Sequence, residues 1–224
     1  MIETIETKVR YETLKPMVRA KICGITRLED ALLAEQLGAW ALGFILAPGT
    51  PRYLEPTQIR PISSALGPFV VRVGVFVDTP PEKVLEQMEA ARLQVAQLHG
   101  HEPPEWAEHI RRFYPVIKAF KLKGPAQPDW LGYPADALMV DGVNPGSGQG
   151  YPLDWIAPLR QHPRLIIAGG LKPENLPAAL ELAPYAVDVS SGVEAAPRLK
   201  DPHKLRAFLA QVASFNGISR NQYT

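Results

Sequence analysis

Two side chains of this 224-residue chain are candidates for catalysis, because each ends a short apolar run. Cys23, the one thiol of the sequence, ends the run 18–23, and Asp141 ends the run 137–141. A lone cysteine is more often a small buried hydrophobe than a catalytic group, and a carboxylate in such a place can also cap the next loop. Their shared position at the ends of apolar runs favours the catalytic interpretation of both.

Two short loops have the small residues that suit a bound phosphate group. They contain Gly169 and Gly170 after the run 165–168, and Ser190, Ser191 and Gly192 at the end of the run 186–190. Open backbone amides and hydroxyls can surround an anion, whereas each glycine alone could be a residue of a tight turn. Both loops together favour phosphate, because they would be neighbours in a closed barrel.

Three further polar residues could bind other parts of a substrate. Arg52 lies in a proline-stiffened loop, where it could be a solvated charge or could bind a substrate carboxylate through its guanidinium group. Gln97 and His99 lie in the run 95–99, and His99 alone would be interpreted as a hydrogen-bonded packing residue. We expect all three to face the same site as Cys23.

Eight short apolar runs, rich in β-branched residues, place these candidates along the chain. The runs are 18–23, 41–46, 69–77, 95–99, 116–122, 137–141, 165–168 and 186–190. Their spacing of roughly 20–30 residues is the length of one βα unit. Such units fit a closed barrel or an open doubly wound sheet. Eight near-equal units, with no G-x-G-x-x-G fingerprint after the first run, predict a single α/β domain, a (β/α)8 TIM barrel.

The signals for helices are uneven along the chain. Residues 26–29 and 79–82 have the T-x-x-E pattern of a capping box, the second with proline at the first helical position. Gly38 is the expected stop of the first helix, and Asp201-Pro202 opens the last one. The fifth helix is predicted to be short or irregular, because residues 123–136 are rich in turn-forming residues.

A barrel of this type also predicts which side chains point inward. Reacting groups lie at the carboxyl ends of the strands. Strand side chains alternate between two faces, so Lys21 should point into the barrel with Cys23, and Asp188 with Ser190. The first and eighth strands are neighbours after closure. We therefore predict a Lys21–Asp188 ion pair inside the barrel, beneath Cys23, the alternative being that one of the two turns outward.

Composition limits the classes of partner. The formal net charge of +1 gives no strong electrostatic case for nucleic acid or an anionic membrane. One cysteine excludes a disulfide framework and a cysteine-based metal cluster, and no apolar run approaches the ~18–20 residues that span a bilayer. Residues 1–10 contain no signal-like segment. We expect a compact cytoplasmic protein that binds neither nucleic acid nor membrane.

Seven short motifs occur in order within residues 18–214. They are KICGIT (21–26), GFI (43–45), PRY (51–53), VGVF (73–76), QLHG (97–100), AGGL (168–171) and DVSSGVE (188–194). A single motif of this kind is weak evidence, but the ordered set is specific. By these motifs the chain resembles the phosphoribosylanthranilate isomerase family.

The resemblance implies an Amadori rearrangement of N-(5-phosphoribosyl)anthranilate to 1-(2-carboxyphenylamino)-1-deoxyribulose 5-phosphate, a step of tryptophan biosynthesis. By position it implies Cys23 as general base, Asp141 as general acid and Arg52 as the partner of the anthranilate carboxylate. Gln97 and His99 are expected to bind substrate, and the glycine- and serine-rich loops its phosphate. One acid and one base suffice, so no cofactor or metal is expected. A free thiol has a pKa near ~8.5, so Cys23 needs a cationic or dipolar neighbour to act at neutral pH.

The departures from the family pattern lie away from the expected acid and base. The loop before Arg52 reads APGTP (47–51), where the family more often has a lysine and a serine, and Pro197-Arg198 replaces a commoner Pro-Gly. The family usually begins where this chain has Met17. We predict an N-terminal extension over residues 1–17, a barrel over 18–214 and a C-terminal tail over 215–224. Monomer and homodimer both stay open.

Two other functions compete with this interpretation. The imidazole isomerase of histidine biosynthesis performs the same rearrangement on a similar barrel. That family is expected to use two aspartates, one of which stands at the position of Cys23. A non-catalytic phosphate-binding barrel would need only the glycine- and serine-rich loops. Cys23 disfavours the first alternative, and the presence of both Cys23 and Asp141 at strand ends disfavours the second.

Overall fold

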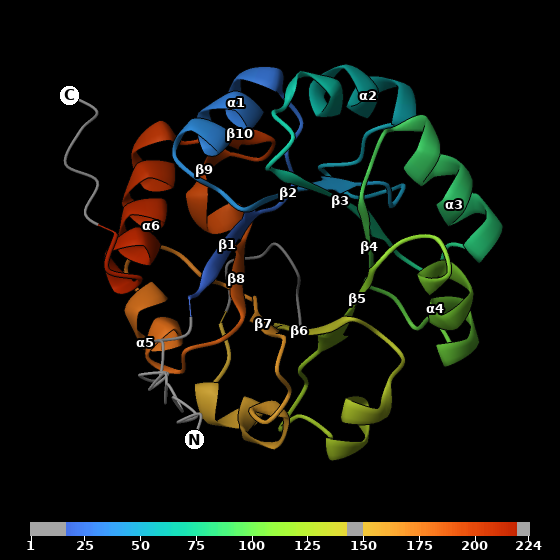
Figure 1. Ribbon diagram of the computed structural model, residues 1–224. Helices are drawn as coiled ribbons and strands as arrows, with labels where there is room; N and C mark the ends of the chain where they lie inside the picture. The colour runs from blue at the N-terminus through green and yellow to red at the C-terminus, as the bar shows by residue number, and fades with distance from the viewer. Residues whose placement is uncertain (1–16, 143–149, 219–224) are drawn as a thin grey trace, which may run out of the picture.

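Eight parallel strands form a closed barrel in the computed structural model, which describes residues 17–142 and 150–218 (Figure 1). The strands are β1 (Arg19–Ile22), β2 (Ala41–Ile45), β3 (Val71–Phe76), β4 (Val95–Leu98), β5 (Val116–Lys121), β6 (Ala137–Asp141), β7 (Leu165–Ile167) and β8 (Ala186–Val189). Each strand pairs with the next one along the chain, and β8 pairs with β1. The predicted (β/α)8 TIM barrel is confirmed.

Alternation of side chains along the strands produces two apolar cores. Outward side chains such as Phe44 and Phe76 pack against the surrounding helices in one large cluster. Inward side chains form a smaller cluster of Ala119, Ala137, Met139, Ile166, Ala168 and Ala186. Four of these six residues are alanine, so the interior has room for polar side chains from neighbouring strands.

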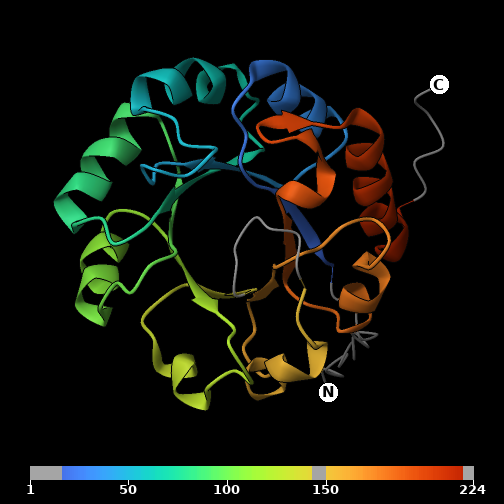
Figure 2. The same cartoon turned by 180° about the vertical axis from the view of Figure 1, so that it is seen from behind.

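Helices surround the barrel on the outside (Figure 2). The α-helices are α1 (Leu28–Gln36), α2 (Pro56–Ala65), α3 (Pro81–Ala90), α4 (Pro104–Arg111), α5 (Leu176–Glu181) and α6 (Pro202–Phe215), and the 3-10 helices are η1 (Pro128–Gly132), η2 (Leu153–Leu159) and η3 (Ser191–Val193). The short fifth helix is confirmed as η1, whose Trp130 stacks on Phe120 of β5 at 4.3 Å between ring centroids. The sixth helix, η2, is also of the 3-10 type and contains Pro158, which the sequence analysis did not predict.

Helix capping was predicted correctly at the last helix and wrongly at two others. The Asp201 carboxylate accepts hydrogen bonds from the backbone N–H groups of His203 and Lys204 at the start of α6. The hydroxyls of Thr26 and Thr79 instead donate to carbonyl oxygens, so neither caps a helix. A capping box forms at α2, between Glu55 and Gln58.

A small hairpin follows the last barrel strand. It consists of β9 (Glu194–Ala196) and β10 (Leu199–Lys200), which pair in an antiparallel manner after η3.

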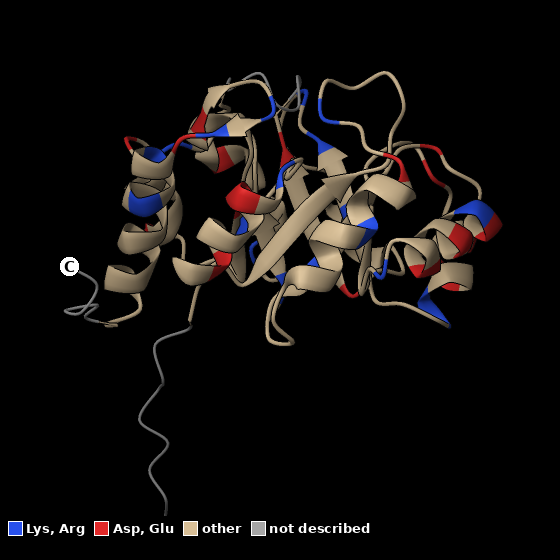
Figure 3. Ribbon diagram, turned by 90° about the horizontal axis from the view of Figure 1, so that it is seen from above, with Lys and Arg blue, Asp and Glu red and all other residues tan. Residues whose placement is uncertain are grey.

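The eight barrel strands point toward the edge of the molecule where the long loops gather (Figure 3). Positive and negative residues are interspersed over the outer helices (Figure 3). No helix among the described residues combines the length and the apolar character needed to cross a membrane.

Candidate active site

A cavity of about 330 Å³ opens at the carboxyl ends of the strands. Its polar and sulfur-containing lining residues are Cys23, Thr50, Arg52, Gln97, His99, Lys121, Asp141, Asp188 and Ser190. The structure therefore brings together the five residues predicted as catalytic or substrate-binding: Cys23, Asp141, Arg52, Gln97 and His99. Lys121 and Asp188 line the cavity as well, and neither was predicted to bind substrate.

The Asp141 carboxyl group is held on one side and faces a histidine on the other. Its Oδ1 accepts a hydrogen bond from the Gly142 backbone N–H at 2.7 Å, and its Oδ2 lies 3.2 Å from His99 Nε2. The Gln97 amide nitrogen lies 3.1 Å from His99 Nδ1. An amide N–H can only donate, so Nδ1 accepts and the ring proton is placed on Nε2, facing Asp141.

Cys23 lies directly above the predicted ion pair. Lys21 Nζ is 2.6 Å from Asp188 Oδ1, and both side chains are buried, so the prediction of an internal pair is confirmed. Burial raises the pKa of the Cys23 thiol, while the positive charge of Lys21 opposes that rise. The cationic neighbour that a catalytic thiol needs is therefore present beneath the sulfur.

Arg52 is held in place by a carboxylate that the sequence analysis did not identify. Its Nε donates to Glu194 Oε1 at 2.7 Å and its Nη2 to Glu194 Oε2, in the two-bond geometry typical of arginine with a carboxylate. Arg52 is only 8% exposed, so the alternative of a solvated loop charge is wrong. Its Nη1 has no hydrogen bond within the part of the chain that the structure describes.

Lys200 joins this cluster to the end of β1. Its ammonium group donates to Glu194 Oε1 at 3.1 Å, to the Cys23 carbonyl oxygen at 2.7 Å and to the Ser190 carbonyl oxygen at 3.1 Å. Burial raises the pKa of Glu194, but the hydrogen bond from Arg52 and the charge of Lys200 outweigh it, so this pKa lies below its usual range. Lys200 thus ties the hairpin that carries Glu194 to the mouth of the barrel.

Gly24 allows Arg52 to cross the first loop. Its φ of +72° is in the left-handed region, and a Cβ there would lie 2.4 Å from Arg52 Cδ and 2.9 Å from Ser190 Oγ. Glu194 lies within the DVSSGVE motif, but Arg52 and Glu194 are 142 residues apart in the sequence, and no local pattern predicts their contact. Only the fold shows that the two loops meet.

The two loops predicted to bind phosphate lie against each other. Gly169, Gly170, Ser190 and Ser191 line one small hollow of about 30 Å³. A Cβ on Gly192 would lie 1.8 Å from the Leu171 carbonyl oxygen, so only glycine permits this approach of the loops. The Asn175 side chain donates to the Gly170 carbonyl oxygen at 2.9 Å and so supports the first loop.

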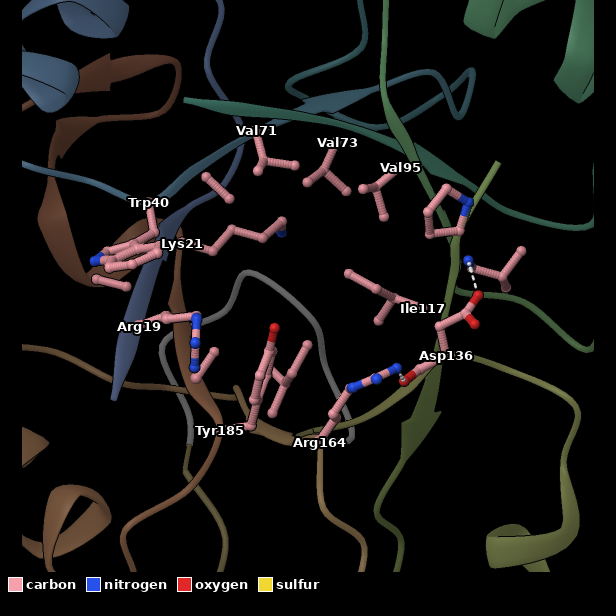
Figure 4. Close-up of a pocket in the computed structure, with 16 residues that line it drawn as sticks. Arg19, Lys21, Trp40, Val71, Val73, Val95, Ile117, Asp136, Arg164 and Tyr185 are labelled. Atoms are coloured by element: carbon pink, nitrogen blue, oxygen red, sulfur yellow. Dashed lines mark hydrogen bonds between the residues drawn. The ribbon is translucent and has the colours of Figure 1, made fainter. Parts of the chain in front are cut away.

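A second hollow, of about 350 Å³, opens at the opposite end of the barrel (Figure 4). Apolar side chains such as Val71, Val73, Val95 and Ile117 line it, and the Lys21 side chain reaches into it from β1. The candidate acid and the thiol do not line this hollow. The polar mouth at the carboxyl ends of the strands is therefore the candidate active site.

Comparison with known proteins gives one consistent result. Residues 20–211 match the protein family described as N-(5'-phosphoribosyl)anthranilate (PRA) isomerase. The crystal structure of phosphoribosyl anthranilate isomerase from Thermus thermophilus is 65% identical in sequence, covers 88% of this chain and 99% of its own, and has a TM-score of 0.86.

Two further solved structures are similar over the same part of the chain. One is a phosphoribosyl anthranilate isomerase in complex with reduced 1-(o-carboxyphenylamino)-1-deoxyribulose 5-phosphate, with 41% identity, coverage of 88% and 100%, and a TM-score of 0.80. The other contains monomers generated from the dimeric enzyme of Thermotoga maritima, with 39% identity, coverage of 88% and 100%, and a TM-score of 0.79.

Proposed function

The chain belongs to the N-(5'-phosphoribosyl)anthranilate isomerase family, and from this premise we propose how the residues at its barrel mouth divide the reaction. The protein is an isomerase of tryptophan biosynthesis, which converts N-(5-phosphoribosyl)anthranilate to 1-(2-carboxyphenylamino)-1-deoxyribulose 5-phosphate by an Amadori rearrangement. One observation carries the proposal: Cys23 and Asp141, from the ends of β1 and β6, line a single cavity.

Two proton transfers start the rearrangement. An acid gives a proton to the furanose ring oxygen as the bond from that oxygen to C1′ breaks and the anthranilate nitrogen forms a double bond to C1′, which leaves an open-chain protonated Schiff base. A base then removes the proton from C2′, and the resulting enaminol tautomerises to the ketose. We assign the first transfer to Asp141 and the second to Cys23. A positioned acid and a positioned base each raise the reaction rate by about 10²–10⁴-fold.

The remaining cavity residues suit the two ends of the substrate. Arg52 holds Glu194 with Nε and Nη2, so its Nη1 is left to bind the anthranilate carboxylate. Gln97 Oε1 is buried without a hydrogen-bond partner among the described residues, so it can accept a bond from a sugar hydroxyl. The hollow between the loops at Gly170 and Ser190 is proposed to hold the phosphate.

The test of this assignment is an isomerase assay on Asp141→Asn and Cys23→Ser variants of the full chain. Each substitution keeps the side-chain size and removes the proposed proton transfer. We expect kcat to fall by at least about 10²-fold in each variant, with an unchanged melting temperature. Turnover within a few-fold of the parent in either variant would remove that residue from the reaction.

The wider setting of the enzyme is also part of the proposal. Its substrate is a small phosphosugar-anthranilate molecule, and we propose cytoplasmic action without nucleic acid or membrane. The catalytic unit is proposed to be residues 18–214, with an extension over 1–17 and a tail over 215–224; residues 1–16, 143–149 and 219–224 lie outside the described residues. Removing residues 1–16 should leave kcat, KM and the melting temperature nearly unchanged, and a large fall in melting temperature would contradict this division.

Of the two oligomeric states left open, we propose the homodimer. The solved relative from Thermotoga maritima is described as dimeric. In this chain Phe69 is 95% exposed, and it precedes by two residues Val71, which lines the apolar hollow at the amino ends of the strands. The exposed aromatic ring and the apolar hollow thus lie on the same face. In a dimer with a two-fold axis, the ring of each subunit can contact the hollow of the other. Phe69→Glu should shift the sedimentation coefficient to that of the monomer, and a wild-type chain that sediments as a monomer would refute the proposal.

A further inference from the structure

We propose that Lys21 is a positioning residue that stabilises the Cys23 thiolate from inside the barrel, and that Gly43 supplies the space in which the two side chains meet. The inference rests on the proposed role of Cys23 as base. It assigns a role in the reaction to two further residues, the charged Lys21 and Gly43, which has no side chain.

The geometry of β1 and β2 brings three positions together. Lys21 and Cys23 are two residues apart, so both point into the barrel. Lys21 pairs with Ala41 of β2 in the sheet register, which places Gly43 beside Cys23. A Cβ on Gly43 would lie 2.7 Å from Cys23 Sγ and 3.0 Å from Lys21 Nζ. The sulfur and the ammonium nitrogen therefore lie against the same small space.

The backbone does not explain a glycine at position 43. Gly43 lies inside β2, and it is not among the glycines whose φ is positive. A glycine inside a strand weakens the strand and often marks a close approach of other atoms. Here the approaching atoms are Nζ and Sγ, so the missing side chain at position 43 leaves room for both of them.

Stability alone does not explain the charge on Lys21. A buried ion pair often contributes no more to stability than apolar residues of the same volume. Lys21 Nζ nevertheless lies 2.6 Å from Asp188 Oδ1 in an interior whose apolar cluster consists of four alanines, Met139 and Ile166. A positive charge at such a site therefore requires a reason other than stability, and stabilisation of the neighbouring Cys23 thiolate is one.

Other charged groups around Cys23 come from several elements. They are Asp188 of β8, Lys200 of β10, Arg52 of the β2–α2 loop and, across the mouth, His99, Lys121 and Asp141. Lys200 contacts the Cys23 carbonyl oxygen and not its sulfur, and Arg52 is paired with Glu194. Among the described cations, Lys21 is the one that shares the space at Gly43 with Sγ.

The proton transfer explains why this contact matters. The thiolate removes the proton of C2′ and becomes a neutral thiol, while the Lys21 ammonium group keeps its charge throughout. Lys21 therefore acts by raising the fraction of thiolate before the step. One unit of thiol pKa changes that fraction about tenfold at a pH well below the pKa.

The test measures the thiol itself, because Cys23 is the only cysteine of the sequence. The ultraviolet absorbance of the thiolate is followed against pH in the wild-type enzyme and in Gly43→Ala, with Cys23→Ser as the blank. A methyl group at position 43 would lie 2.7 Å from Sγ and 3.0 Å from Nζ, so these atoms must shift from their present positions. We expect the thiol pKa to rise by about one unit and kcat/KM at pH 7 to fall about tenfold, with the acid limb of its pH profile moving by the same amount and KM nearly unchanged.

Two matched glycine variants control for packing. In Gly74→Ala the new Cβ would meet only apolar side chains, the closest at 2.8 Å, whereas in Gly132→Ala it would meet open space. Both should leave the thiol pKa as in the wild type, even where Gly74→Ala lowers the melting temperature. A rise of the thiol pKa in Gly74→Ala equal to that in Gly43→Ala would overturn the inference.

A second variant covers the case in which Gly43→Ala does not fold. The double substitution Lys21→Met with Asp188→Asn removes both interior charges and leaves no carboxylate unpaired. The charge of Asp188 raises the thiol pKa, but that of Lys21 lowers it more strongly. We therefore expect a folded protein whose thiol pKa is again raised, and an unchanged thiol pKa would refute the role of Lys21. If the pKa rises but the acid limb of kcat/KM does not follow, the contact is supported and the assignment of Cys23 as base fails.

Discussion

Replacing Lys21 by methionine should strongly destabilise the folded barrel. Lys21 and Asp188 have side chains that are 4% and 10% exposed, and their charged atoms lie 2.6 Å apart. Methionine fills a similar volume but leaves the Asp188 carboxylate buried without its partner. Removing one member of a buried pair costs about 3–5 kcal/mol. For a chain of this size, each 1 kcal/mol lowers the melting temperature by roughly 2–4 °C.

Chemical denaturation measures this loss directly. Urea unfolding of the wild type and of Lys21→Met at pH 7 should give midpoints that differ while the slopes agree. The double variant Lys21→Met with Asp188→Leu should recover most of the loss, because no charge is left unpaired.

Two results would refute the reasoning. A loss of unfolding free energy below about 1 kcal/mol in the single variant would show that water or another donor binds the Asp188 carboxylate. A loss of that size is typical of exposed ion pairs. A double variant as unstable as the single one would show that the lysine side chain is needed for its shape and not for its charge.

Three further predictions concern the site. Asp141→Asn should lower kcat about 10²–10⁴-fold while circular dichroism and the melting temperature stay unchanged; activity near that of the parent would refute its role as acid. Arg52→Ala should raise KM by roughly ten- to a hundredfold, since a charge-assisted hydrogen bond contributes about 1.5–3 kcal/mol, and steady-state kinetics with an unchanged KM would show that the guanidinium does not touch substrate. The pKa of Glu194 is lowered in the folded protein, so its contribution to stability is complete above the usual value near 4.5 and is lost as pH falls through the folded pKa. Glu194→Gln should accordingly lose stability at pH 7 in thermal unfolding, and the difference from wild type should shrink below pH 4; a difference independent of pH would contradict the assignment.

The barrel itself was predictable because its signals are local. Apolar runs at a regular spacing require strands covered by helices, and a period of two decides which residues face inward. Closure then places β8 beside β1, which is why the contact between Lys21 and Asp188 followed from counting along two strands. The position of Cys23 and Asp141 at strand ends followed from the same reasoning.

Hydrogen bonds of single side chains were not predictable in this way. Thr26 and Thr79 have the spacing of helix caps, yet their hydroxyls donate to the carbonyl oxygens of Arg198 and Val77. A hydroxyl bonds to whichever partner the surrounding backbone offers, and for Thr26 that partner is brought near by a hairpin more than 170 residues away. Intrinsic preference is a weak guide where tertiary contacts supply a competing acceptor.

The residues of the candidate site could therefore be predicted from the sequence, whereas the hydrogen bonds and ion pairs between them depended on tertiary structure. The types and positions of Cys23, Asp141 and Arg52 could be read from runs and motifs. The binding of both Arg52 and Lys200 to the Glu194 carboxylate depends on how a β2–α2 loop and a hairpin after β8 fold over the same opening. Loop conformations of this kind carry no periodic pattern, because contacts with distant residues set them, and so only the folded barrel decides which charges meet.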